Sequence, residues 1–417
     1  MSKDQINPMG KRAFLFKLLQ DIRASYWFLP SALVCLAVVM SQMSLHLDRT
    51  PSLLPFELPK GLRDTQVEGA RSLMTIISQS VFGVAGVMFS MTIVAVSFAS
   101  GNFGPRLIGN FMRDRGNQWS LGILVATFVY ALMITRAIQS PTGEGTDLSA
   151  DLFVPHLSIT VALCLTFVSV FTVIFFVHHI PETINVSNIT ASLGKRLVTS
   201  IKAVIDDTAD QDRKDIALPH RDPDCCVALD LAGYIQTLNT EQLRTLAGKH
   251  DLIIDVCRPV GAFVTEDTDV MRVWGQDISD EIRTELRNSF ALGQSQTENQ
   301  NLLFIIAQLV EMVARALSPG VNDPFTAINC LNWLHAAILA AANYNGGLRA
   351  RACDAVHTAP MLFEDVLQAS FGASLHYINS DPLCAAHVSG LVDDLRVQIK
   401  DTDHRKTLET FSAKLET

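Results

Sequence analysis

The chain has 417 residues, with 33 Lys and Arg against 42 Asp and Glu, which gives a formal charge of −9 at pH 7. This acidic balance argues against a nucleic-acid partner bound by bulk electrostatics. The hydrophobic share of 48% exceeds that of an average soluble protein, and the mean hydropathy is positive. The composition therefore predicts membrane segments together with at least one further domain.

Four apolar segments each provide about the 20 residues that a bilayer crossing requires. They cover residues 26–45, 73–100, 119–138 and 154–180. The basic start of the chain leads into an apolar run that is too long for the core of a signal peptide, so we expect no cleaved signal. The sequence predicts an α-helical domain with four transmembrane helices.

The charges between these segments predict the orientation. The connection 101–118 carries the basic residues Arg106, Arg113 and Arg115, whereas the connection after the third segment has Glu144, Asp147 and Asp151 and no Lys or Arg. By the positive-inside rule, we expect both termini on the cytoplasmic side of a bacterial inner membrane.

The second apolar segment carries small and polar residues at steps of three, four or seven, so they share one helical face. They are Thr75, Gln79, Gly83, Gly86, Ser90 and Ser97. One interpretation is close helix packing through small residues, and the other is the lining of a hydrated pathway. Because no residue of the set is ionisable, the second interpretation favours a pore over a proton relay.

Segment 103–115 is amphipathic and has Pro105 at a plausible first helical turn. Its arginines, Arg106, Arg113 and Arg115, are able to reach phosphate headgroups, as in a helix lying on the inner leaflet. The alternative is that these charges only set the topology.

A helical hairpin is predicted between Asn301 and Ala342. Pro319 and Gly320 end its first arm, and Asp323 before Pro324 caps the second arm. Both arms interrupt apolar runs with polar side chains, which we expect to meet near the turn. The candidate site consists of Glu311, Arg315, Asn322, Asp323, Asn329, Asn332 and His335.

Three accounts of this polar set stay open. The groups form a structural network that buried polar atoms need, or they bind an ion or small ligand and signal to the membrane helices. The third account is an acid–base set, but no nucleophile motif, phosphate loop or metal spacing accompanies it. We therefore expect no enzyme, catalytic residue or cofactor.

The sequence predicts no metal site either. Its eight cysteines lack metal spacing and are expected to be reduced and mostly buried. His178 and His179 are adjacent, so on a helix they point about 100° apart, and no carboxylate partner is evident near them in the sequence.

The run ARALSPGVNDPFTAI at 314–328 resembles the signature of a family of bacterial integral membrane proteins known as domain of unknown function 2254. Residues 103–122 resemble that family's loop between its second and third membrane helices, and 258–273 resemble its β-rich segment. The chain departs from the family pattern at 298–300 and 307–311. The resemblance implies architecture and a membrane location, but no activity.

The soluble part is expected to be α+β. Half-motifs at 233–235 and 261–264 resemble those of barrel-sandwich modules, and helices are expected at 277–292, 348–371 and 382–414. The predicted divisions are a cytoplasmic N-terminal segment 1–24, a four-helix membrane domain 25–181, a helical linker 182–224, a β-rich barrel-sandwich-like module 225–275 and a helical cytoplasmic domain 276–417. The favoured function is an oligomeric channel or transporter with a cytoplasmic regulatory domain, with the bilayer and further copies of the chain as partners; the alternative is a non-conducting sensor or scaffold.

Overall fold

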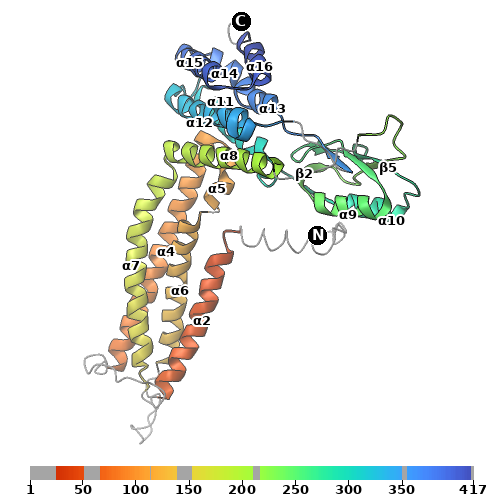
Figure 1. Ribbon diagram of the computed structural model, residues 1–417. Helices are drawn as coiled ribbons and strands as arrows, with labels where there is room; N and C mark the ends of the chain where they lie inside the picture. Colours follow the sequence, from red (N-terminus) through yellow and green to blue (C-terminus); the bar gives the residue numbers. More distant parts are fainter. Residues whose placement is uncertain are drawn as a thin grey trace, which may run out of the picture. The chain divides into compact units, whose positions relative to one another are not determined.

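A computed structural model describes residues 25–50, 66–112, 114–138, 153–209, 217–349 and 355–414 (Figure 1). The chain divides into two compact units. Among the described residues, the apolar unit comprises those up to Gly101 and those within Pro105–Asn185, and the α+β unit comprises Asn102–Gly104 and those from Val186 onward. The end of the second apolar helix therefore belongs to the α+β unit.

The described residues of the apolar unit form four long helices: α2 (Phe28–Arg49), α4 (Val67–Phe103), α6 (Arg115–Ala137) and α7 (His156–Thr183). They coincide with the four predicted apolar segments. A short 3₁₀ turn at Pro105–Leu107 and helix α5 (Ile108–Met112) follow α4. The buried core draws on all four long helices, through residues such as Leu45, Met74, Leu124 and Phe176.

Polar groups inside the apolar unit bond to one another across helices. The Tyr130 hydroxyl lies 2.8 Å from Ser44 Oγ, and Ser169 Oγ lies 3.0 Å from Thr127 Oγ1. Asp48, near the end of α2, accepts hydrogen bonds from the backbone N–H groups of Leu157 and Ser158 at 2.9 and 3.0 Å. Its carboxylate thus caps α7, whose own N-cap residue is a proline.

In the described part of the chain, five helices are long and apolar enough to cross a membrane. Four are the helices of the apolar unit, and the fifth covers Pro324–Gly346. This fifth helix, α12 (Pro324–Asn343), lies in the α+β unit. Length and hydropathy alone therefore allow one more span than the predicted four.

In the described residues of the α+β unit, seven short strands form two sheets. One sheet has the order β1 (Cys225–Ala228), β5 (Asp269–Trp274), β3 (Ile253–Val256), β7 (Val356–Thr358), and only the β3–β7 pair among these is parallel. The other has the order β4 (Phe263–Val264), β2 (Gly233–Leu238), β6 (Phe290–Gly293). Helices α9 (Thr240–His250) and α10 (Asp280–Arg287) complete this β-rich part.

The expectation that the chain is wholly helical after Gly275 is wrong. Strand β6 follows α10 and pairs with β2, and strand β7 lies within the predicted helix 348–371 and pairs with β3. Both strands have only three or four residues, too few for an alternating pattern to stand out from a helical one. The predicted helix 382–414 is also two helices, α15 (Pro382–Gln398) and α16 (Thr402–Ser412).

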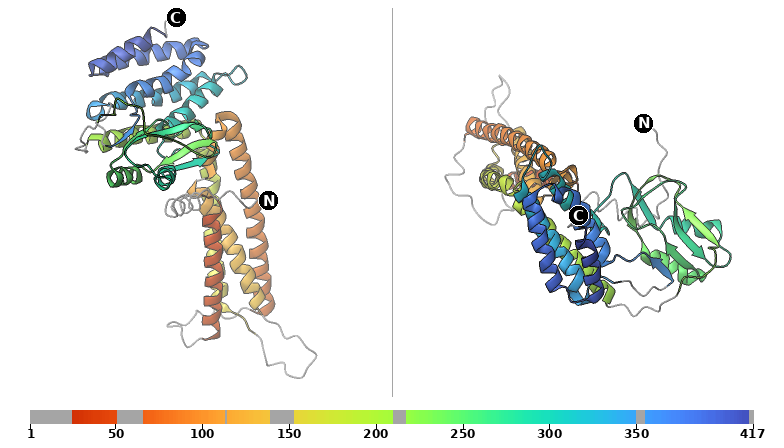
Figure 2. Two further views of the ribbon diagram at one scale, coloured as in Figure 1. Left: turned by 90° about the vertical axis from the view of Figure 1, so that its right-hand side faces the viewer. Right: turned by 90° about the horizontal axis from the view of Figure 1, so that it is seen from above.

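A helix bundle forms the rest of the α+β unit. It contains α8 (Val186–Ala209), α11 (Leu302–Ala316), α12, α13 (Phe363–Leu367), α14 (Ala373–Asn379), α15 and α16. Helix α12 lies inside this bundle, against α8, α11 and α15 (Figure 2). Its residues Cys330, Leu331, Leu334, Ala337 and Ile338 are fully buried. Gly194 on α8 gives the Trp333 ring room, because a Cβ there would overlap the indole.

Candidate functional site

The predicted hairpin is present, and Asp323 caps its second arm. The Asp323 carboxylate accepts a hydrogen bond from Thr326 N at 3.1 Å and one from Thr326 Oγ1 at 2.5 Å. Asn322 before it has φ +50°, a left-handed conformation that Asn tolerates better than most residues, and its side chain is exposed. These two residues of the candidate set thus shape the turn.

Glu311 and Arg315 pair along α11. The Arg315 Nε atom lies 3.5 Å from Glu311 Oε1, and both side chains are half-buried. Glu311 also packs against Gly104, the residue after α4, where a Cβ would lie 2.7 Å from the carboxylate. Gly104 has φ +119°, so both its backbone conformation and the space there require glycine.

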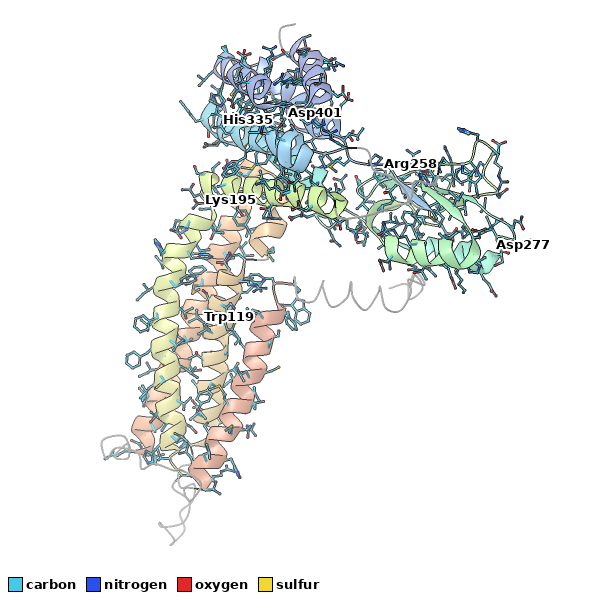
Figure 3. All side chains as sticks on the ribbon, viewed as in Figure 1. Trp119, Lys195, Arg258, Asp277, His335 and Asp401 are labelled. Atoms are coloured by element: carbon cyan, nitrogen blue, oxygen red, sulfur yellow. The ribbon has the colours of Figure 1, made fainter. Side chains whose placement is uncertain are left out.

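Asn332 and His335 contact α15. The Asn332 Oδ1 atom lies 2.7 Å from His387 Nε2, and His335 Nε2 lies 3.1 Å from Asp394 Oδ2. His335 lies on α12, inside the helix bundle (Figure 3). Asn329, one turn earlier, is exposed. These contacts join α12 to α15 along one side of the bundle.

The structure therefore distributes the candidate residues over two places. Glu311 and Arg315 lie together on α11, whereas Asn332 and His335 bond to α15, so the polar side chains of the two arms do not gather at the turn. Among the described residues, no group of three or more His, Cys, Asp or Glu is able to hold a metal ion. Burial raises the pKa of the Cys384 thiol, beside the turn, to about 12, so this thiol stays protonated at neutral pH.

The capping contact gives a prediction. Asp323→Ala is expected to lower the free energy of unfolding by about 0.5 to 2 kcal/mol, because the first amide groups of α12 lose their acceptor. Asp323→Asn keeps an acceptor oxygen and should be nearly silent. Thermal unfolding in detergent measures both variants. If Asp323→Asn keeps the fold but abolishes function, the negative charge of Asp323 acts on a ligand or ion, and capping is not its whole role.

The small and polar stripe of α4 lies on its exposed side. Gln79, Gly83, Gly86, Ser90 and Ser97 are exposed, and Thr75 is half-buried. The buried residues of α4 include Ala85, two residues after Gly83, and Met88, two residues after Gly86. Two residues correspond to about 200° around a helix, so the buried face lies opposite the stripe. The chain's own bundle thus packs on one side of α4 and leaves the stripe uncovered.

The arginines predicted to contact lipid headgroups follow α4. Arg106 and Arg115 are exposed, and Arg113 lies outside the described residues. Arg106 lies in the 3₁₀ turn that follows Gly104, and Arg115 begins α6.

Sequence reasoning missed a carboxylate–histidine pair in the apolar unit. His179 Nε2 lies 2.8 Å from Oδ1 of Asp114, the N-cap residue of α6. The expectation that these histidines have no carboxylate partner is wrong, because the partner of His179 comes from 65 residues upstream and Glu182 lies one turn after His178. Gly116 makes this approach possible, since a Cβ there would overlap the imidazole ring. His178 lies 3.4 Å from Glu182, where both side chains are exposed.

A second missed feature is the joint formed by 296–301, which connects the β-rich part to the helix bundle. Gln300 Oε1 accepts a hydrogen bond from Leu238 N at 2.9 Å, and Gln296 Nε2 donates to Gly261 O at 2.9 Å. Glu298 pairs with Arg196 of α8, and Asn301 caps α11. The departure from the family pattern at 298–300 thus falls on a structural joint.

Four long apolar helices joined to an α+β unit define the class as a membrane protein. The chain belongs to the family described as predicted membrane protein, domain of unknown function 2254, whose model matches residues 23–394. The resemblance inferred from the sequence is confirmed. The family description, like the sequence, names no activity.

Similar chains occur in mycobacteria. An uncharacterised protein of Mycobacterium bovis and one of Mycobacterium tuberculosis are each 28% identical to this chain over 331 residues. The match covers 76% of this chain and 61% of each relative, so the chain spans about three-fifths of the length of these curated relatives. No solved structure matches the chain.

Proposed function

We propose that the protein is an oligomeric channel or transporter of the bacterial inner membrane, in which α4 of each copy faces a shared axis. The observation that carries the proposal is the uncovered stripe of α4. Side chains that face lipid are normally apolar, whereas this exposed face presents Gln79, Gly83, Gly86 and Ser90. Further copies of the chain would cover this face and gather it into a pathway.

The proposal assigns four spans to each copy. Helices α2, α4, α6 and α7 cross the bilayer, and α12 does not, although it is long and apolar enough. The physical reason is that α12 already buries its apolar side against α8, α11 and α15 and directs Asn332 and His335 to polar partners on α15. The high hydropathy of α12 is therefore explained by its place in the core of the helix bundle.

Reconstitution tests the function. The purified protein is placed in planar bilayers, its current is recorded over a range of voltages and membrane tensions, and its assembly size is measured by native mass spectrometry. We expect an oligomer that passes ions or small solutes. A stable oligomer that passes neither under any of these conditions would move the assignment to the non-conducting alternative.

The proposal of four spans also predicts the membrane topology. Both termini lie in the cytoplasm, and the acidic connection with Glu144, Asp147 and Asp151 lies outside, because positive loops remain on the inner side. Thiols introduced at Gly145 and Ala209 in a cysteine-free background are labelled with an impermeant reagent. We expect Gly145→Cys to react in intact spheroplasts and Ala209→Cys to react only after permeabilisation; the opposite pattern refutes four spans with this orientation.

A membrane-anchored sensor or scaffold is the second candidate, and the end of α4 favours it. Helix α4 runs through the apolar unit, yet Asn102–Gly104 belong to the α+β unit, where Gly104 contacts Glu311. A change in the helix bundle could therefore reach α4 directly. A ligand that binds the α+β unit and changes the labelling rate of a thiol in α4, in a protein without conductance, would support this candidate.

A further inference from the structure

The turn of the helical hairpin exposes apolar side chains in the α+β unit. Phe325 is 71% exposed, Val321 is 50% exposed and Leu383 is 47% exposed. Leu383 lies beside the turn, because the Cys384 thiol is 3.7 Å from the Pro324 carbonyl oxygen. We call Val321, Phe325 and Leu383 the turn patch.

The turn contains almost no charged group whose desolvation would oppose burial in an apolar environment. Asp323 is the one charged residue between Arg315 and His335 in the sequence. Its carboxylate accepts hydrogen bonds from the Thr326 amide and hydroxyl groups. A turn of this composition loses little hydration free energy when it leaves water, whereas its exposed Phe and Val gain from the transfer.

Helices α8 and α12 run side by side in the same direction. Trp333 packs on Gly194, and eleven to twelve residues further along both helices, Tyr344 and Asn345 bond to Asp206 at 2.9 and 2.8 Å. Counting back eight residues from Gly194 on α8 and from Trp333 on α12 pairs Val186 with Phe325. Phe325 is therefore level with the first residue of α8, and only two residues separate the end of α7 from the start of α8.

The segment that follows α4 also meets the helix bundle near the end that carries the turn. Gly104, which follows α4, contacts Glu311, and five residues separate Glu311 from the end of α11 at Ala316. Five residues of helix span about 7.5 Å. Both α4 and α7 thus enter the α+β unit close to the end of the bundle that carries the turn.

We propose that the turn patch is a lipid-contacting surface, which rests on the inner leaflet of the membrane that α4 and α7 cross. The inference rests on the membrane spans and does not require conduction. Because α4 and α7 tether this end of the bundle to the bilayer, the exposed Phe325 and Val321 lie within reach of the headgroup and upper acyl region. Burial there removes apolar surface from water, as with interfacial anchors of other membrane proteins.

Exposed apolar residues at the other end of the bundle provide a control. Val397 on α15 is 80% exposed. Helix α15 runs in the same direction as α12, since Asn332 bonds to His387 near its start and Asn343 bonds to Gln398 at its end. Val397 therefore lies at the end of the bundle away from the turn, and we expect it to face water.

Photocrosslinking in native membrane vesicles tests the inference. Benzoylphenylalanine replaces Phe325, Val397 or, as a positive control, Phe171, which is 70% exposed on α7. After irradiation, mass spectrometry detects lipid adducts. We expect position 325 to yield about tenfold more lipid adduct than position 397, because transfer of a Phe-sized side chain from water favours the apolar phase by at least that factor.

Two results would overturn the inference. Equal lipid yields at positions 325 and 397, with abundant adducts at 171, mean that the turn faces water. A crosslinked dimer at 325 without lipid adducts means that a second copy of the chain covers the patch. Weak adducts at all three positions, including 171, would instead contradict the membrane spans themselves. Absence of current would overturn only the channel proposal and leave this inference standing.

Discussion

Replacement of Gly86 by leucine is expected to abolish flux through the reconstituted protein and to preserve both the fold of each chain and the assembly. No described atom of the chain would lie within 4 Å of a Cβ at Gly86, so the substitution meets no resistance inside one copy. A leucine also favours the helix by roughly 1 kcal/mol over glycine. Around a shared axis, by contrast, the leucines of all copies meet and occlude the pathway. Ser90→Leu should act in the same way.

Val87→Leu is the control for these variants. Val87 is adjacent to Gly86 in the sequence and 59% exposed, but it lies off the stripe, where lipid tolerates leucine. Flux and native mass spectrometry are measured for wild type and the three variants. If Gly86→Leu instead breaks the oligomer, the stripe serves helix packing; if it leaves both flux and assembly unchanged, the stripe faces neither a pathway nor another copy.

Gly194→Ala is expected to destabilise the α+β unit by about 1 to 3 kcal/mol, a cost typical of overpacking. The added methyl group would overlap the Trp333 indole and force α8 and α12 apart. Denaturant unfolding, followed by the fluorescence of the tryptophans, measures the change. Trp333→Phe should offset part of the loss in the Gly194→Ala background, because the smaller ring leaves room for the methyl group.

Gly390→Ala is the matched control in the same bundle. Gly390 is an exposed residue inside α15, where a Cβ meets no described atom within 4 Å. Gly390→Ala should raise the free energy of unfolding of the α+β unit by up to about 1 kcal/mol, because alanine restricts the unfolded chain and favours the helix. Equal effects of the two substitutions would show that Gly194 is not a site of close packing.

The sequence predicts the parts of this fold that local patterns determine. The four long apolar helices follow from runs of about 20 apolar residues, and the start of α12 follows from Asp323 before Pro324. Strands β6 and β7 were missed because they exist through pairing with β2 and β3, and three or four residues carry no reliable period of their own.

Contacts between distant residues limited the prediction of the site. Helical spacing placed Glu311 and Arg315 together, and placed Asn332 and His335 on one face of α12. It did not reveal that this face meets His387 and Asp394 of α15, because the packing partner of a helix is a tertiary property. The Asp114–His179 pair was hidden for the same reason.

The stripe of α4 faces the proposed pathway, and chemical modification of a thiol introduced at position 90 tests this orientation most directly. Ser90→Cys and Val87→Cys are made in a background in which the exposed Cys35, Cys164 and Cys226 are alanine. Each variant is reconstituted in planar bilayers and treated with a water-soluble, bulky methanethiosulfonate reagent. The account predicts that the reagent abolishes the current of Ser90→Cys and leaves that of Val87→Cys unchanged. A Ser90→Cys current that persists after treatment, with labelling of the thiol verified by mass, would contradict it.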